Sequence, residues 1–85
     1  MTYFVTVKAL IDKADFMGLL EMGAPSDEYD IESKMITSKI TEQSNANDIA
    51  SIIAEVFYEM FGQRKNESFY LPVAQSIYED ISSVR

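Results

Sequence analysis

The apolar residues between positions 49 and 61 constrain the fold of this chain most strongly. They recur at the three- and four-residue spacing that lays a single stripe along a helix: Ile49, Ile52, Ile53, Val56, Phe57, Met60 and Phe61. Asn47 is a suitable N-cap, Asp48 suits the positive end of the helix dipole, and Gly62 is a typical residue just past a helix end. The sequence therefore predicts a helix that begins after Asn47, ends near Gly62 and buries its stripe against other elements.

Two further segments carry the same helical spacing. One helix is expected from about Asp30 to about Thr41, with Ser26 or Asp30 as its N-cap and one apolar side formed by Ile31, Met35, Ile36 and Ile40. A last helix is expected to start at Pro72, a favoured first-turn residue, with a face formed by Val73, Ala74, Ile77, Tyr78, Ile81 and Val84.

The first segment has both strand and helix character. Residues 2–7 are mostly β-branched or aromatic, yet a helical face is formed by Tyr3, Val7, Leu10, Ile11 and Ala14. No second convincing strand exists to pair with it, so we interpret the segment as a helix. A short helical turn should follow, capped by Asp15 and stopped by Gly23 and Pro25.

These segments together predict the architecture. Four helices with short connections and no internal repeat favour an all-α fold, a compact four-helix antiparallel bundle with a short extra helical turn after the first helix. We expect residues 1–85 to form a single helical domain, with Ile53 and Phe57 at the centre of its core.

The residue types limit the chemistry that is available. The chain has no histidine and no cysteine, so the usual general base near neutral pH and the most easily ionised nucleophile are both missing. We expect no catalytic activity and no cofactor.

Carboxylates remain as candidate ligands, and the densest group surrounds Tyr29: Asp27, Glu28, Asp30 and Glu32. A calcium loop needs acids at alternate positions, then glycine, then a glutamate at the twelfth position, and no window supplies them. We therefore expect no metal site. These carboxylates either cap the following helix and interact with its dipole, or bind a partner.

Charge is distributed unevenly along the sequence. Seven Lys and Arg against fourteen Asp and Glu give a net charge of −7, which argues against direct binding to nucleic acid or anionic membrane. Residues 14–33 contain six acids and no base: Asp15, Glu21, Asp27, Glu28, Asp30 and Glu32. If these acids share a face, their field would steer a basic protein partner.

We hypothesise a partner-binding site within this segment, made of Asp15, Asp27, Glu28, Tyr29, Asp30 and Glu32. Tyr29 is its expected anchor, because tyrosine combines apolar area with a hydroxyl. Alternatively, Tyr29 packs inward and braces the loop against the second helix. Tyr58 lies off the main stripe of its helix, and Phe69 and Tyr70 lie in or beside a connection, so these three residues are a second candidate surface.

We expect a cytoplasmic protein. The first residues, MTYFVTVKAL, lack the basic start and the small-residue cleavage site of a signal peptide. No run reaches the roughly 18 apolar residues that span a bilayer.

Residues 15–32, D-F-M-G-L-L-E-M-G-A-P-S-D-E-Y-D-I-E, resemble the signature of a family of small helical proteins from Gram-positive bacteria with uncharacterised function. The family pattern is approximately D-P-x-G-L-L followed by G-x-P-x-D-E-Y-D-x-E. The matching positions are Asp15, Gly18, Leu19, Leu20, Gly23, Pro25, Asp27, Glu28, Tyr29, Asp30 and Glu32, and later Phe57, Phe61 and Gly62. Phe16 stands where a proline is usual. The resemblance implies a helical fold of about this length and no particular activity.

Three functions follow as hypotheses. The first is a protein-interaction module, such as an antitoxin or immunity-like inhibitor that uses its acidic 15–32 face against a basic enzyme. The second is a structural homo-oligomer, for example a homodimer, that buries an apolar face of the first or last helix against its own copy. An enzyme or metal-binding protein that uses the acidic loop is the least favoured.

Overall fold

Four helices form the regular structure of residues 3–62 and 65–83, which are the residues that the computed structural model describes. They are α1 (Phe4–Ala14), α2 (Asp30–Lys39), α3 (Ala46–Phe61) and α4 (Glu67–Ser83). The described ranges contain no strand, so the all-α prediction is confirmed, including the helical assignment of the ambiguous first segment. Val84, expected on the last helix, lies outside the described residues.

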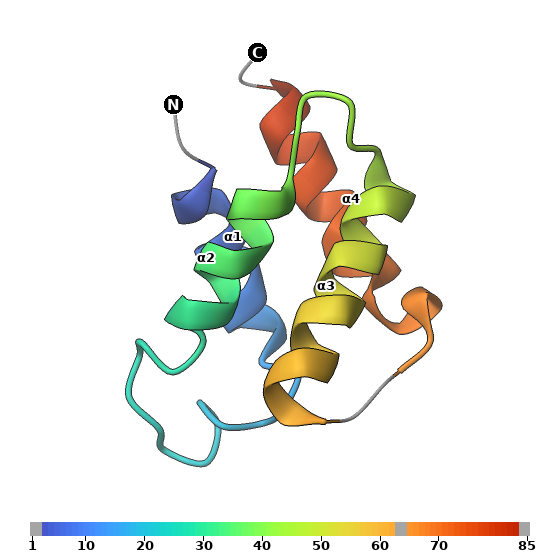
Figure 1. The fold of residues 1–85 in the computed structure, drawn as a ribbon. Coiled ribbons are helices and arrows are strands. Elements are labelled where there is room, and N and C mark those ends of the chain that lie inside the picture. Colours follow the sequence, from blue (N-terminus) through green and yellow to red (C-terminus); the bar gives the residue numbers. More distant parts are fainter. Residues whose placement is uncertain (1–2, 63–64, 84–85) are drawn as a thin grey trace.

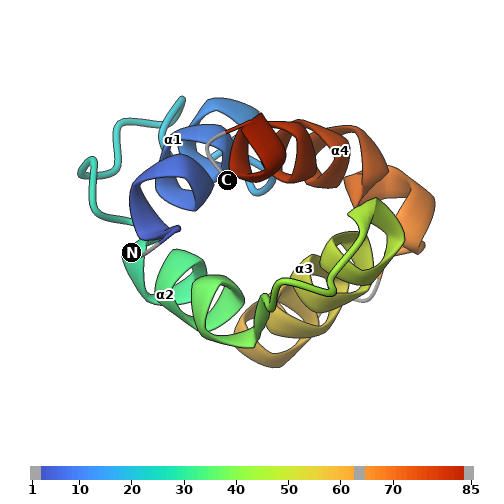
Figure 2. The same cartoon turned by 90° about the horizontal axis from the view of Figure 1, so that it is seen from above.

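Successive helices run in opposite directions (Figure 1). Viewed from above, they form a ring around a common centre, and each helix packs against the two helices next to it in the ring (Figure 2). The α3–α4 pair makes the most extensive contact. This is the antiparallel four-helix arrangement that the apolar stripes predict.

The start of α3 is fixed by a reciprocal pair of hydrogen bonds. The Asp48 N–H donates to Asn45 Oδ1 over 2.8 Å, and the Asn45 N–H donates to Asp48 Oδ2 over 3.0 Å. The N-cap is therefore Asn45, and the prediction of Asn47 was wrong, because Asp48 lies three residues after Asn45 and completes a capping box with it. Gly62 ends the helix in the left-handed conformation, at φ 74°, as predicted.

Helix α4 begins earlier than the sequence predicts. Its first residue is Glu67, and Pro72 lies inside the helix. A proline there removes the N–H that would bond to the carbonyl of Ser68, but Ser68 is exposed, so water can satisfy that carbonyl. The additional turn places Tyr70 in the core with 2% of its surface exposed, so the prediction of an exposed Tyr70 was wrong.

Helix α2 begins at Asp30, as predicted, but its N-cap and its last residue differ from the prediction. Its N-cap is Tyr29, whose side chain makes no capping hydrogen bond, instead of Ser26 or Asp30. The helix ends at Lys39 because Ile40 adopts an extended backbone and directs its side chain into the core.

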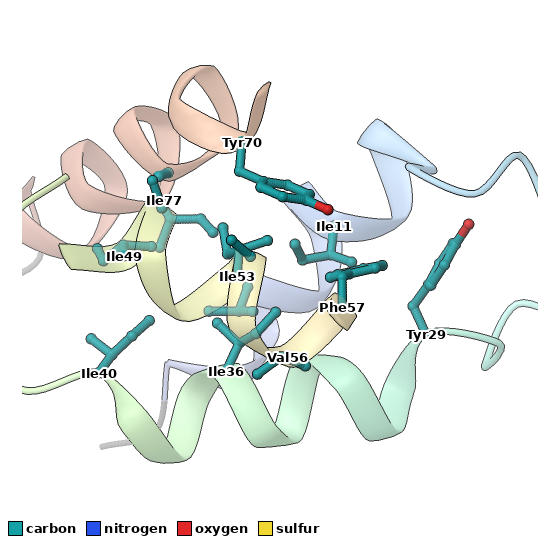
Figure 3. Packing of buried hydrophobic residues seen from close by; sticks show 14 of the residues in the cluster. Ile11, Tyr29, Ile36, Ile40, Ile49, Ile53, Val56, Phe57, Tyr70 and Ile77 are labelled. Atoms are coloured by element: carbon teal, nitrogen blue, oxygen red, sulfur yellow. The ribbon is translucent and has the colours of Figure 1, made fainter. Parts of the chain in front are cut away.

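All four helices contribute to the core, as expected for a bundle (Figure 3). Ile53 and Phe57 are 0% and 1% exposed, which confirms their predicted central position. The Phe57 ring is surrounded by other aromatic rings, with centroid distances of 5.4 Å to Phe16, 5.5 Å to Phe61, and 6.0 Å to both Tyr29 and Tyr70. Aromatic contacts at these distances add to the area that Phe57 buries.

Phe57→Ala should lower the free energy of unfolding by about 3–5 kcal/mol, because it leaves a cavity at the centre of this cluster. Urea unfolding followed by circular dichroism measures the change. The neighbouring exposed residue provides the control, since Glu59→Ala should change stability by no more than about 0.5 kcal/mol. A loss below about 1 kcal/mol for Phe57→Ala would contradict its central position.

Candidate functional site

The acidic segment, residues 15–32, consists of the connection between α1 and α2 and the first residues of α2. The connection projects from one end of the bundle (Figure 1). Helix α1 ends where Asp15 adopts the left-handed conformation, at φ 46°. Hydrogen-bonded turns follow: the Gly18 N–H donates to the Asp15 carbonyl over 2.8 Å, and the Met22 N–H donates to the Gly18 carbonyl over 3.2 Å. The expected extra helical turn is thus a series of tight turns.

The Asp15 carboxylate organises these turns, as its predicted capping role requires. It accepts hydrogen bonds from the Leu20 N–H over 3.1 Å and from the Glu21 N–H over 3.0 Å. It also accepts a 2.6 Å hydrogen bond from the Tyr29 hydroxyl. The Tyr29 hydroxyl contributes most to lowering the pKa of Asp15 below its ordinary value, and the backbone N–H groups act in the same direction. Both oxygens of Asp15 are therefore engaged within the protein.

Tyr29 adopts the inward alternative. Its ring is fully buried beside Phe57, and its hydroxyl points away from α2 (Figure 3). The hydroxyl donates to Asp15 and accepts from the Met17 N–H over 3.1 Å and the Leu19 N–H over 3.4 Å. Burial raises the pKa of Tyr29, and its hydrogen bond to Asp15 adds to the effect. In this structure Tyr29 holds the loop on the core and offers no exposed area to a partner.

A base from outside the segment reaches the acids. Lys8 Nζ on α1 lies 2.6 Å from Asp30 Oδ1 and 2.8 Å from Asp12 Oδ2, and it donates to the Ser26 carbonyl over 3.0 Å. The hydrogen bonds to Asp12 and then Asp30 raise the pKa of Lys8. The acidic segment has no base in the sequence, but the fold supplies Lys8, whose single positive charge is shared between Asp30 and Asp12.

Glu32 differs from the other acids because it is buried, with 4% of its surface exposed. Its Oε1 atom is buried without a hydrogen-bond partner among the described residues. Burial raises the pKa of Glu32, and the like charges of Glu28 and Asp30 add to the effect. From the sequence we expected Glu32 to be exposed like the other acids, since glutamate is ordinarily an exposed residue.

Three acids remain exposed: Glu21, Asp27 and Glu28. We call them the free acids, because no described residue forms an ion pair with any of them. Two exposed apolar residues are close to them in sequence. Met22 follows Glu21 and is 81% exposed, and Ile31 lies three residues after Glu28 and is 62% exposed. The segment thus presents carboxylates together with apolar side chains.

Hollows on the surface lie elsewhere. One lies beside the start of α4 and is lined by Ala54, Lys65, Asn66 and Glu67. Another lies between α1 and α4 and is lined by Leu10, Lys13, Ala14, Pro72, Val73 and Ser76. Neither contains a residue of the predicted site. Within residues 3–62 and 65–83, no three His, Cys, Asp or Glu side chains are grouped so that they could hold a metal ion.

The second candidate surface is only partly exposed. Tyr58 and Phe69 are each 46% exposed, whereas Tyr70 is buried. Phe69 packs against Phe16 at a centroid distance of 5.6 Å, and Lys65 Nζ lies 4.9 Å from the centre of the Phe69 ring. Phe69 therefore has contacts within the protein that account for its position.

Comparison with protein-family models, curated proteins and solved structures gives no match to this chain. The family resemblance of residues 15–32 therefore stays a prediction. None of the helices in the described ranges is long and apolar enough to cross a membrane.

Tyr29→Phe should lower the free energy of unfolding by about 1–2 kcal/mol, because it removes the hydroxyl that joins Asp15 to the loop backbone. Tyr70→Phe is the matched control, since Tyr70 is also buried but its hydroxyl forms no hydrogen bond with the described residues. Urea unfolding of both variants provides the comparison. Equal losses in the two variants would show that the Tyr29 hydroxyl has no special role.

The raised pKa of Glu32 leads us to predict how the stability of the protein depends on pH. A group whose pKa is raised on folding contributes stability that is complete below its ordinary pKa, here 4.5, and is lost as pH rises through the folded-state value. Glu32→Gln cannot ionise, so it should be more stable than the natural protein at pH 7 but not at pH 4. Urea unfolding at both pH values tests this, with exposed Glu59→Gln as the control. The prediction fails if Glu32→Gln gives no gain at pH 7 over pH 4.

Proposed function

We propose that this protein is a non-catalytic interaction module that binds a basic protein partner through its free acids, Glu21, Asp27 and Glu28. The observation that carries the proposal is that the acids of the segment differ in their contacts. Asp15 and Asp30 are engaged in internal contacts, whereas the free acids are exposed and have no ion pair with a described residue. The side chains of the free acids form no hydrogen bond with the described residues either.

Charge and apolar area together define the partner. The net charge of −7 repels nucleic acid and anionic membrane and speeds the approach of a basic protein. Met22 and Ile31 provide apolar area that can be buried once the partner has docked. A cytoplasmic inhibitor of antitoxin or immunity type, which blocks a basic enzyme such as a nuclease, fits this description by analogy of size and charge.

The homo-oligomer is kept as a second candidate, since one observation favours it. The hollow between α1 and α4 is lined partly by the apolar residues Leu10 and Val73, and Val5 on α1 is 74% exposed. A second copy could cover this face. In the interaction-module proposal the protein stays monomeric without its partner, so its mass in solution distinguishes the two functions.

Charge reversal of two free acids tests the proposal. The double variant Asp27→Lys, Glu28→Lys should lose a partner that the natural protein captures from extracts of the source cell at about 150 mM salt. Its matched control, Glu42→Lys with Asp80→Lys, makes the same change of net charge at two exposed positions. Glu42 belongs to the α2–α3 connection and Asp80 to the last turns of α4, and both segments lie at the other end of the bundle from the α1–α2 connection (Figure 1). Purified partner then gives association rates for both variants.

The expected result is slow, weak association for the loop variant and near-normal association for the control. If both variants bind the captured partner equally well, the free acids are not the interface. If the purified protein is a dimer in solution and the loop variant is a dimer as well, the homo-oligomer is favoured instead.

A further inference from the structure

Glu32 is a buried acid that forms no ion pair with a described residue, and the only described group that favours its ionised form is its own backbone N–H. Its side chain is 4% exposed, and Oε1 has no hydrogen-bond partner there. Acidic side chains are almost never fully buried unless they are paired, because removing a carboxylate from water is costly. An uncompensated carboxylate at this depth therefore requires an explanation.

None of the described lysines compensates Glu32. Lys8 is bound to Asp12 and Asp30, Lys39 Nζ lies 3.5 Å from Glu55 Oε1, and Lys65 lies over the Phe69 ring. Lys13 lines the hollow between α1 and α4. Lys34 is exposed and lies two residues after Glu32, a spacing at which helical side chains do not face each other. A cation that stabilises the ionised form of Glu32 would therefore come from outside the described part of the protein.

The position of Glu32 makes it reachable from the free acids. Glu32 is the third residue of α2, and exposed Glu28 comes just before the N-cap of the same helix. The charge of Glu28 acts on Glu32, since it helps to raise the pKa of Glu32. Ile31, next to Glu32, is 62% exposed. Rotation about the side-chain bonds of Glu32 would bring its carboxylate toward the surface beside Glu28. A cation attracted by Glu28 would then meet Glu32.

We propose that Glu32 receives an arginine side chain of the basic partner, with Glu28 guiding that side chain to it. This inference rests on the proposed function. Arginine fits better than lysine because its planar guanidinium is always charged, is weakly hydrated and can donate two parallel hydrogen bonds to one carboxylate. A metal ion fits less well, since no third acidic ligand is grouped with Glu32 within the residues the structure describes.

A synthetic peptide of alternating arginine and leucine is a suitable probe, and the same peptide with lysine in place of arginine is its counterpart. Isothermal titration calorimetry gives the affinity of each peptide for the natural protein, Glu32→Gln, Glu28→Gln and the distant control Glu42→Gln. Glu32→Gln should weaken arginine-peptide binding by at least about 10-fold, and Glu28→Gln by about 2–5-fold. The control should bind normally.

The preference for arginine provides a readout that a merely structural role would not affect. The natural protein should bind the arginine peptide more tightly than the lysine peptide, and Glu32→Gln should bind both alike. Glu32→Asp, which keeps the charge but shortens the side chain, should also reduce the preference. Circular dichroism checks that each variant is folded.

The outcomes separate this inference from the proposed function. If Glu28→Gln weakens binding but folded Glu32→Gln and Glu32→Asp bind both peptides as the natural protein does, Glu32 is not the arginine site and the free acids remain the interface. If the natural protein binds neither peptide, or every variant binds alike, this inference fails. The proposed function fails separately, if charge reversal of Asp27 and Glu28 leaves binding of the captured partner unchanged.

Discussion

The hydrogen bond between the Tyr29 hydroxyl and the Asp15 carboxylate determines how the acidic segment is arranged. It joins residues that are 14 positions apart, and it is supported on one side by the buried Tyr29 ring and on the other by backbone N–H groups that Asp15 caps. Because the aromatic ring is part of the same cluster as Phe57, the loop is anchored to the most strongly packed part of the core. The Asp15 carboxylate thus joins the start of the loop to Leu20 and Glu21 in its middle and to Tyr29 at its end.

This arrangement separates the acids of the segment by role. Asp15 and Asp30 stabilise the loop through Tyr29 and Lys8, and Glu21, Asp27 and Glu28 extend into solvent. Glu32 belongs to neither set, since it is buried without a compensating charge among the described residues. Departures from the ordinary rules of burial are expected at functional sites, and Glu32 lies in the first turn of α2, close in sequence to exposed Glu28. The stabilising and the binding parts of the segment are therefore adjacent but distinct.

Sequence patterns predicted the helices better than they predicted the site. The wide stripe of α3 identified Phe57 as a core residue, because helical spacing reports directly on burial. The cap of α3 was misplaced because two asparagines precede it and only the reciprocal bond with Asp48 distinguishes Asn45. The start of α4 was misplaced because Pro72 lies within the helix, where the hydrogen bond that it removes would have gone to the carbonyl of exposed Ser68. In the loop, periodicity gives no information, so the inward position of Tyr29 and the approach of Lys8 from another helix could not be derived.

The pKa values of the individual acids can be measured by NMR, from the chemical shifts of the side-chain carboxyl carbons of the natural protein as a function of pH. We expect Asp15 to titrate below its ordinary pKa, since it accepts the Tyr29 hydrogen bond, and Glu32 to titrate above its ordinary pKa, since it is buried beside like charges. The same titration of Tyr29→Phe should move the Asp15 pKa upward and leave that of Glu32 unchanged. Ordinary titration of both Asp15 and Glu32 would contradict the account, because neither acid would then be set apart from the exposed ones.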